Sequence, residues 1–194
     1  MNPTLGSPEP GTASPNAPQP PRPAGRLGGI RQWLGAHVVG ILWANLIAEA
    51  AIIVTGGLVR LTGSGLGCPT WPQCVDGSLT PTVTQEQGYH KYIEFGNRTL
   101  TGVLGVLAVL ALLAVVAAYP RRKRMIWLAA GLVGGVLSQA VVGGITVRTG
   151  LNPWIVAFHF LCSILMVAMC VMLLRGARDG ADGADGPGEA LVPS

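Results

Sequence analysis

The chain has 194 residues, of which 49% are hydrophobic and only 11% are charged, and its mean hydropathy is +0.48. A soluble domain normally carries about 25% charged residues, so this deficit excludes an ordinary water-soluble protein and indicates a lipid environment. The formal net charge of +4 is small and scattered along the chain. A nucleic-acid-binding surface needs clustered basic residues, so we expect no nucleic acid partner.

The two ends of the chain have a composition that is typical of disorder. Residues 1–30 are rich in Pro, Gly, Ser and Ala, and residues 176–194 are rich in Gly and Asp. Segments of this kind cannot bury enough apolar surface to order themselves, so we predict a disordered tail at each end. The acidic C-terminal end resembles a natural tail more than an interrupted loop, which favours a short form of the protein.

Four apolar runs of bilayer length lie between the tails. About 20 residues of helix cross the hydrocarbon core, and the runs are continuous rather than alternating, which excludes the strands of a membrane barrel. The sequence therefore predicts an all-α integral membrane four-helix bundle over residues 31–175. The predicted spans are residues 37–59, 92–119, 125–147 and 154–174.

Lys and Arg are more frequent on one side of the predicted spans than on the other. One side carries Arg22, Arg26, Arg31, Arg121, Arg122, Lys123, Arg124, Arg175 and Arg178, whereas the other carries Arg60, Lys91 and Arg148, with Arg98 just inside the second span. Cytoplasmic loops carry the excess of positive charge, so we predict that both termini are cytoplasmic. We expect a multi-pass protein of the plasma membrane.

Polar side chains at membrane depth are costly and often mark a functional site. The predicted spans contain Asn45, Glu49, Glu94, Asn97, Arg98, Gln139 and His159, and His90 precedes the second span. His90, Glu94 and Asn97 share one helical face because they are spaced i, i+4 and i+7. His159 lies about 8 Å from the outer end of its helix, at a depth similar to that of Glu94. A bundle could gather Glu94, Asn97 and His159 in one pocket, where the imidazole is a natural ligand for haem iron.

Each of these residues also has a structural interpretation. A lone histidine in a helix is more often a hydrogen-bonded interior residue than a ligand. Glu94 could pair with Lys91 or Arg98, and Glu49 could be a protonated packing group that pairs with Asn45 or Gln139.

The connection after the first span holds two cysteines, Cys68 and Cys74, separated by five residues that include two prolines. This spacing permits a closed turn, and a compartment outside the cytoplasm permits a disulfide. A zinc site would need two more ligands at short spacing, and only His90 is near. The pattern therefore favours a redox-capable cysteine pair over a metal site.

Three segments resemble the haem A synthase family of respiratory membranes. They are GGLVRLTGSGLGCPTWPQC at residues 56–74, IEFGNR at residues 93–98 and GLNPWIVAFHFLCS at residues 150–163. The resemblance covers about residues 31–174 and corresponds to the N-terminal half of an eight-helix protein. It implies the oxidation of a methyl group of haem O to the formyl group of haem A, for cytochrome oxidase.

The resemblance also implies roles for individual residues. His159 matches an iron ligand, Glu94 matches a catalytic acid, and Cys68 and Cys74 match an outer-loop cysteine pair. The family motif Glu-x-x-His-Arg departs here, because Asn97 stands in the position of the second histidine. Either His90 replaces that ligand or His159 alone holds the iron.

At the outer rim, three arginines could pair with haem propionates, and we expect their replacement to weaken haem retention. They are Arg60, Arg98 and Arg148.

Three functions are compatible with these residues. The first is a haem A synthase with haem as substrate or b-type cofactor, acting as a half-size homo-oligomer or as the N-terminal part of a longer product whose C-terminal half is missing here. Its partners would be membrane lipid, haem O and the enzyme that supplies haem O. The second is a non-catalytic haem-binding electron carrier, and the third is an assembly partner that hands haem onward. Glu94 and the cysteine pair favour the enzyme, because an electron carrier needs neither.

Overall fold

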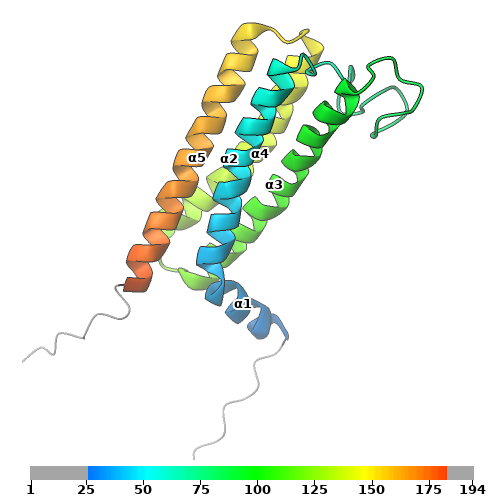
Figure 1. The fold of residues 1–194 in the computed structure, drawn as a ribbon. Coiled ribbons are helices and arrows are strands. Elements are labelled where there is room, and N and C mark those ends of the chain that lie inside the picture. Colours follow the sequence, from blue (N-terminus) through cyan, green and yellow to red (C-terminus); the bar gives the residue numbers. More distant parts are fainter. Residues whose placement is uncertain (1–25, 183–194) are drawn as a thin grey trace, which may run out of the picture.

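The computed structural model describes residues 26–182, which form five helices and, within that range, no strand longer than an isolated bridge between Val75 and Ser78. Figure 1 shows a short helix at one end of a bundle of four long ones. The helices are α1 (Arg26–Ala36), α2 (Val38–Leu61), α3 (His90–Ala118), α4 (Lys123–Arg148) and α5 (Pro153–Asp182).

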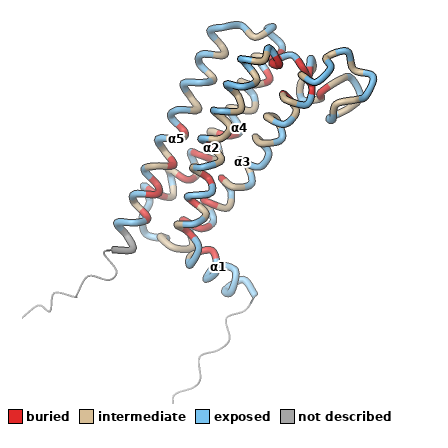
Figure 2. The backbone as a smooth tube through the Cα atoms, in the orientation of Figure 1, coloured by how far each residue is buried: buried red, intermediate tan, exposed pale blue. Residues whose placement is uncertain are grey.

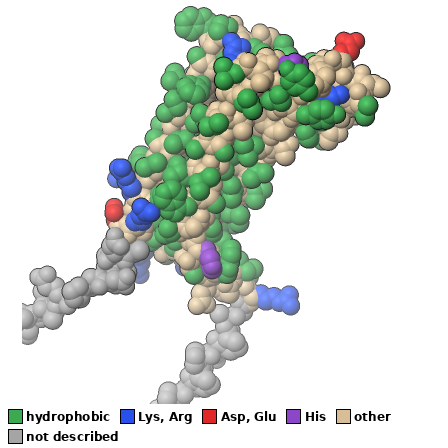
Figure 3. Space-filling model, viewed as in Figure 1, with side chains coloured by type: hydrophobic (Ala, Val, Ile, Leu, Met, Phe, Trp, Pro, Cys, Tyr) green, Lys and Arg blue, Asp and Glu red, His purple; other side chains and the backbone are tan. Residues whose placement is uncertain are grey.

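The four long helices, α2 to α5, are each long and apolar enough to cross a membrane. In the space-filling view, hydrophobic side chains cover the middle of the bundle, and most Lys and Arg side chains lie toward its ends (Figure 3). The chain is therefore a multi-pass membrane protein, as its apolar runs predict.

The long helices form a closed ring in which each packs against two neighbours. Helix α2 contacts α3 and α5, and α4 contacts the same two helices from the other side. Short connections join α3 to α4 and α4 to α5, whereas α2 and α3 are joined by residues 62–89, which fold over one end of the bundle. The two described ends of the chain lie at the opposite end (Figure 1). The predicted all-α four-helix bundle is confirmed.

The helical region is longer than the predicted 31–175. Helix α1 was not predicted, and it packs against α3 through the buried Leu34. Helix α5 continues to Asp182 because its polar end is still bonded to the bundle: the Tyr119 hydroxyl donates to the Ala177 carbonyl at 3.0 Å. The remaining parts of the predicted tails, residues 1–25 and 183–194, lie outside the described residues.

The packed core lies in the half of the bundle nearest the described ends, which we call the inner half. Its fully buried residues include Ala108, Ala111 and Ala114 of α3 and Ala129 and Leu132 of α4. Small side chains let membrane helices approach closely, and close packing is a main source of their attraction in lipid. Figure 2 shows the buried residues concentrated there and at the loop junction of the opposite half, which we call the outer half.

Candidate functional site

The outer half of the bundle is hollow. Two adjoining cavities of about 560 Å³ and about 450 Å³ lie between the helices. Their shared wall is formed by Gly56, Arg60, Asn97, Thr101, Val136, Gln139, Val156 and His159. We call the first the loop cavity, because Trp71 and Pro72 of the connection line it, and the second the inner cavity, because it reaches inward to Glu49 and Met166. Pockets of 300–1,000 Å³ are typical of small-molecule and cofactor sites.

The two cavities open on different sides of the bundle. The inner cavity is bordered by the exposed Arg60 of α2 and by the exposed Ala157 and Phe160 of α5. The loop cavity is bordered by the exposed Gly102 of α3 and Leu137 of α4. Since α2 to α5 are each long and apolar enough to cross a membrane, openings between them would give an apolar ligand a route from the bilayer.

His159 stands in the wall that the cavities share. Its backbone carbonyl accepts hydrogen bonds from Gln139 Nε2 at 2.9 Å and from the Ser163 hydroxyl at 3.1 Å, which link this turn of α5 to α4. Its ring Nδ1 is buried and has no hydrogen-bond partner among residues 26–182. The interpretation of His159 as a hydrogen-bonded interior residue therefore has no support from the ring contacts. A neutral imidazole nitrogen without a partner can ligate a metal.

Glu94 also lines the loop cavity, but both of its carboxylate oxygens are occupied. Oε2 accepts the backbone N–H of Cys68 at 2.8 Å, and Oε1 accepts Arg98 Nε at 3.1 Å and Arg98 Nη2. Of the two pairings proposed from the sequence, the structure has the one with Arg98. Lys91 instead donates to the Thr82 carbonyl at 2.6 Å.

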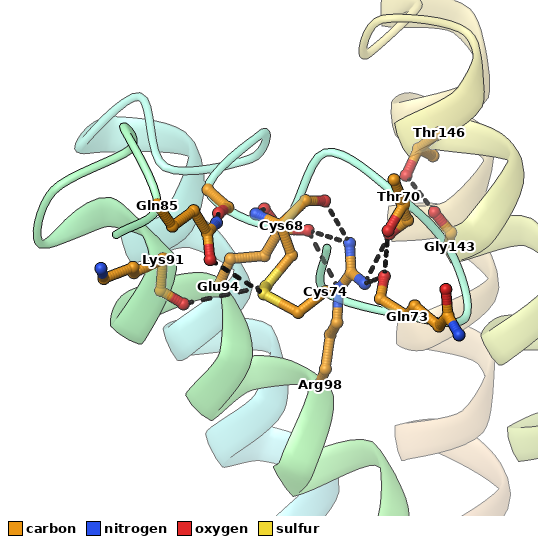
Figure 4. A network of polar contacts seen from close by, with 11 residues as sticks. Cys68, Thr70, Gln73, Cys74, Gln85, Lys91, Glu94, Arg98, Gly143 and Thr146 are labelled. Carbon is orange, nitrogen blue, oxygen red and sulfur yellow. Dashed lines mark hydrogen bonds and ion pairs between the residues drawn. A yellow bond between two sulfur atoms is a disulfide. The ribbon is translucent and has the colours of Figure 1, made fainter. Parts of the chain in front are cut away.

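Arg98 ties the loop to α3, as Figure 4 shows. Besides Glu94, its guanidinium contacts three loop carbonyls: Nη1 donates to Thr70 at 2.8 Å and Gln73 at 3.1 Å, and Nη2 donates to Cys68 at 2.7 Å. A guanidinium has five N–H donors, and the five contacts occupy all of them. In this arrangement Arg98 has no donor left for a haem propionate.

Cys68 and Cys74 form a disulfide, and both are fully buried. The predicted cysteine pair is thus confirmed as a bond that closes the turn held by Arg98. Within residues 26–182, no group of three or more His, Cys, Asp or Glu side chains could hold a metal ion. The zinc alternative therefore finds no support in the described residues.

Two glycines allow the loop to lie against the helices. A Cβ at Gly67 would collide with the backbone of His90 and Lys91 at the start of α3. A Cβ at Gly144 would collide with the indole of Trp71, which packs on α4 at this point. Sequence reasoning missed both contacts. For Gly67, the Gly-rich run before Cys68 was the available signal, because glycine often marks a close approach of backbones.

The structure separates two residues that the sequence placed on one face. Asn97 lines both cavities and accepts a hydrogen bond from the Thr55 hydroxyl at 2.8 Å, which links α3 to α2. His90 lies at the outer end of α3, where its Nδ1 is 2.8 Å from the Ser64 hydroxyl, and it lines neither cavity. Asn97 and His159 share the site, and His90 does not.

The remaining two arginines also differ in position. Arg60 borders both cavities at their outer end, and no acceptor for its guanidinium is present among residues 26–182. Arg148 is exposed, donates to the Trp71 carbonyl at 3.3 Å and lines neither cavity. Of the three arginines predicted at the rim, Arg60 therefore has the most suitable position for an anionic group of a ligand.

Glu49 and Asn45 form a second polar site near the inner end of the inner cavity, which Glu49 lines and Asn45 does not. Their side chains are only 2% and 0% exposed, and neither pairs with the other or with Gln139. The pairings proposed from the sequence are absent among the described residues.

A family model described as cytochrome oxidase assembly protein matches residues 40–190. No solved structure matches the chain.

Several curated relatives are named heme A synthase. The relative from Geobacillus thermodenitrificans is 30% identical over 159 residues, which cover 80% of this chain and 46% of the relative. The relative from Geobacillus kaustophilus is 33% identical over 146 residues, covering 73% of this chain and 42% of the relative. A relative from Listeria monocytogenes is 34% identical over 132 residues, or 66% of this chain. The chain spans less than half the length of these relatives.

Proposed function

Because the chain belongs to the cytochrome oxidase assembly protein family, we propose that it binds haem O in the outer half of its bundle and oxidises a ring methyl group to the formyl group of haem A. Each of two successive hydroxylations adds the oxygen atom of a water molecule to the methyl carbon and passes two electrons to an acceptor outside the chain, with release of two protons. Loss of water from the resulting geminal diol gives the aldehyde. The name of its relatives, heme A synthase, supports this reaction.

The observation that carries the proposal is the position of His159. His159 lines both cavities, and its ring Nδ1 has no hydrogen-bond partner among residues 26–182. An uncommitted imidazole beside a space of this size suits a haem iron. A bound haem would supply the iron for oxidative chemistry and, as substrate, the methyl group. Asn97 is a poor iron ligand and already accepts a hydrogen bond from Thr55, so we propose His159 as the single protein ligand.

Glu94 is the proposed catalytic residue. Its carboxylate is fixed at the wall of the loop cavity by the Cys68 N–H and by Arg98. A preorganised negative group stabilises positive charge that develops at a carbon during oxidation, and it needs no reorganisation to do so. The disulfide turn would act on the reaction by holding this carboxylate in place.

Arg60 is the proposed partner of the haem propionates. It is exposed at the outer border of both cavities, whereas the donors of Arg98 are used by the loop. Arginine suits this role because its planar fork binds carboxylates in a bidentate manner.

The proposed orientation in the membrane rests on the distribution of Lys and Arg, and the proposed assembly rests on the length of the relatives. The end of the bundle that holds the described chain ends also carries the cluster Arg121, Arg122, Lys123 and Arg124, so we place this end in the cytoplasm and the disulfide loop outside. The membrane is then the plasma membrane. The matched segments cover less than half of the relatives, so the working unit would be a homo-oligomer of this four-helix unit or a longer protein of which it is the N-terminal part.

The test is to express the chain in cells that make haem O but lack a haem A synthase, and to identify the haems that co-purify with it. We expect haem A with the wild type, haem O without haem A in Glu94→Gln, and little haem of any kind in His159→Ala. His37→Ala is the matched control, because His37 is exposed at the inner end. A wild type that carries haem O but never yields haem A would refute the enzymatic proposal and leave a haem carrier.

A further inference from the structure

The pair of Glu49 and Asn45 is not explained by any contact within the described chain. Glu49 Oε1 and both amide atoms of Asn45 are buried and have no hydrogen-bond partner among residues 26–182. Buried polar atoms almost always have a partner, because an unsatisfied one destabilises the fold by about 1–3 kcal/mol. Glu49 lines the inner cavity, so a partner from outside the chain can reach it.

The chemistry of the pair defines the partner. The two residues are one helical turn apart on α2 and therefore share a face. An amide both donates and accepts hydrogen bonds, and a carboxyl group accepts them. The neighbouring Gln139 is committed to the His159 carbonyl and the Ser163 hydroxyl. A hydroxyl matches this pair, because it can donate to the Glu49 carboxylate and also accept from the Asn45 amide.

The depth of the pair defines which part of a ligand it meets. Glu49 precedes Arg60 by eleven residues in the same helix, which is about 16 Å along the axis. Propionates held at Arg60 would therefore direct the opposite edge of a porphyrin toward Glu49. In haem O this edge carries a long apolar side chain with a hydroxyl next to the ring, whereas haem B carries a vinyl group there.

We propose that Glu49, supported by Asn45, binds the hydroxyl of the haem O side chain and so makes the site prefer haem O to haem B. This inference rests on the proposed function, because it needs haem in the cavities. Water is the other source of a hydroxyl for this site.

The physical basis of the preference is the cost of an unmatched polar group. The walls of the inner cavity around Glu49 are apolar, with Ile52, Leu104 and Met166 among them. Apolar walls discriminate weakly between ligands of similar shape, whereas a site built to bind a hydroxyl discriminates strongly, because its polar groups stay unpaired with the wrong ligand. Haem B would leave Glu49 without a partner.

The experiment measures the dissociation constants of haem O and haem B for the full chain in lipid nanodiscs, from the change in haem absorbance. We expect the wild type to bind haem O at least tenfold more tightly than haem B, because one hydrogen bond to a buried polar group contributes about tenfold and the apolar side chain of haem O adds to it. Glu49→Leu and Asn45→Leu should lower this ratio about tenfold while haem B binding is kept, and the preference that then remains comes from the apolar side chain that haem B lacks. Glu49→Gln should retain most of the preference, because its amide can still bond a hydroxyl.

The outcomes separate this inference from the proposed function. A wild type that binds neither haem refutes both. A wild type that binds both equally, or leucine variants that keep the wild-type ratio, refutes the hydroxyl site and leaves water as its only occupant. Glu86→Gln, which removes an exposed loop carboxylate, is the control and should not change the ratio. If Glu49→Leu loses haem B as well, Glu49→Ala, which leaves room for water, decides the question by the same ratio.

Discussion

The inner and outer halves of the bundle are held together by different forces. In the inner half, alanines and leucines of α3, α4 and α5 pack without exposed surface. In the outer half the same helices surround two cavities. Polar contacts and the loop hold the helices there (Figure 4). Lipid tails are as apolar as leucine, so membrane helices associate through close packing or hydrogen bonds. Where a cavity removes the packing, hydrogen bonds must replace it.

The loop supplies contacts that link helices on both sides of the outer half. Arg98 and Glu94 bind it to α3, and Trp71 packs it against Gly144 of α4. Below the loop, Thr55 of α2 is bonded to Asn97 of α3. The outer half is thus closed by a lid of irregular backbone rather than by side-chain packing, which leaves the space beneath free for a ligand.

Arg98→Met should show the largest difference between the two halves, because it should destabilise the outer half alone. It removes the cation that neutralises the buried Glu94 and the donors that hold three loop carbonyls. Breaking a buried ion pair costs about 3–5 kcal/mol. Hydrogen–deuterium exchange should accelerate in residues 68–74 and remain slow in the inner half. Arg124→Met, at an exposed inner position, should change neither. Uniform acceleration along the chain would show that the halves are not independent.

Leu132→Ala tests the inner half. Leu132 of α4 is fully buried in the core. The cavity left by the substitution should lower the free energy of unfolding by about 2–3 kcal/mol. This is the lower part of the usual range, because lipid already solvates the apolar side chain in the unfolded state. Unfolding in a detergent titration measures the loss. Haem affinity should stay within threefold of wild type. The lipid-facing Leu113→Ala is the control, and a large loss of haem in Leu132→Ala would contradict the division.

Replacing both loop cysteines by serine should have a moderate effect. The disulfide closes a turn with a sequence separation of six, and loss of such a short crosslink costs about 2 kcal/mol. Since Arg98 still holds the loop carbonyls, the fold should persist with faster exchange of the Cys68 N–H. Cys162→Ser, which alters a free cysteine in α5, serves as the comparison. An unfolded double variant would mean that the arginine contacts cannot hold the loop alone.

The smallest effect is expected for Thr55→Val, which removes the hydrogen bond to Asn97 and keeps the side-chain volume. Hydrogen bonds between membrane helices contribute about 0.6 kcal/mol on average. The same detergent titration should detect a small loss of stability. Thr99→Val is matched to it, because its hydroxyl bonds only to Phe95 of its own helix. Equal losses in both variants would assign no stability to the contact between helices.

Sequence periodicity and apolarity located the spans because lipid imposes the same requirement on every residue that crosses it. The predicted 37–59 and 125–147 differ from α2 and α4 by one or two residues at each end. Helix α1 was missed because it is short and rich in Gly and Arg. Helix α5 was cut at Leu174 because apolarity ends there, although Tyr119 and Arg122 still bond its backbone carbonyls beyond that point.

The site was predictable only where its contacts are local. Glu94 and Arg98 are four residues apart on one helix, and the cysteine pair closes a short turn, so the sequence indicated both. The bond from Cys68 N–H to Glu94 joins residues 26 positions apart through an irregular loop, and no periodicity encodes such a contact. Glu49 Oε1 has no hydrogen-bond partner among residues 26–182. This depends on how the four helices pack around it, which a linear sequence pattern does not contain.

The hydrogen bond from the Cys68 backbone to Glu94 links sulfur chemistry to the geometry of a carboxylate. Reducing the disulfide, oxidising it further or replacing a cysteine would each loosen the turn, so that the Cys68 N–H holds the carboxylate less firmly, although Arg98 still contacts it. A cysteine variant with low turnover would then have the same phenotype as a misaligned acid, even if no thiol ever exchanges an electron. Titrating wild-type protein against reductants of graded potential, with the infrared bands of the carboxylate as a second signal, distinguishes the two origins.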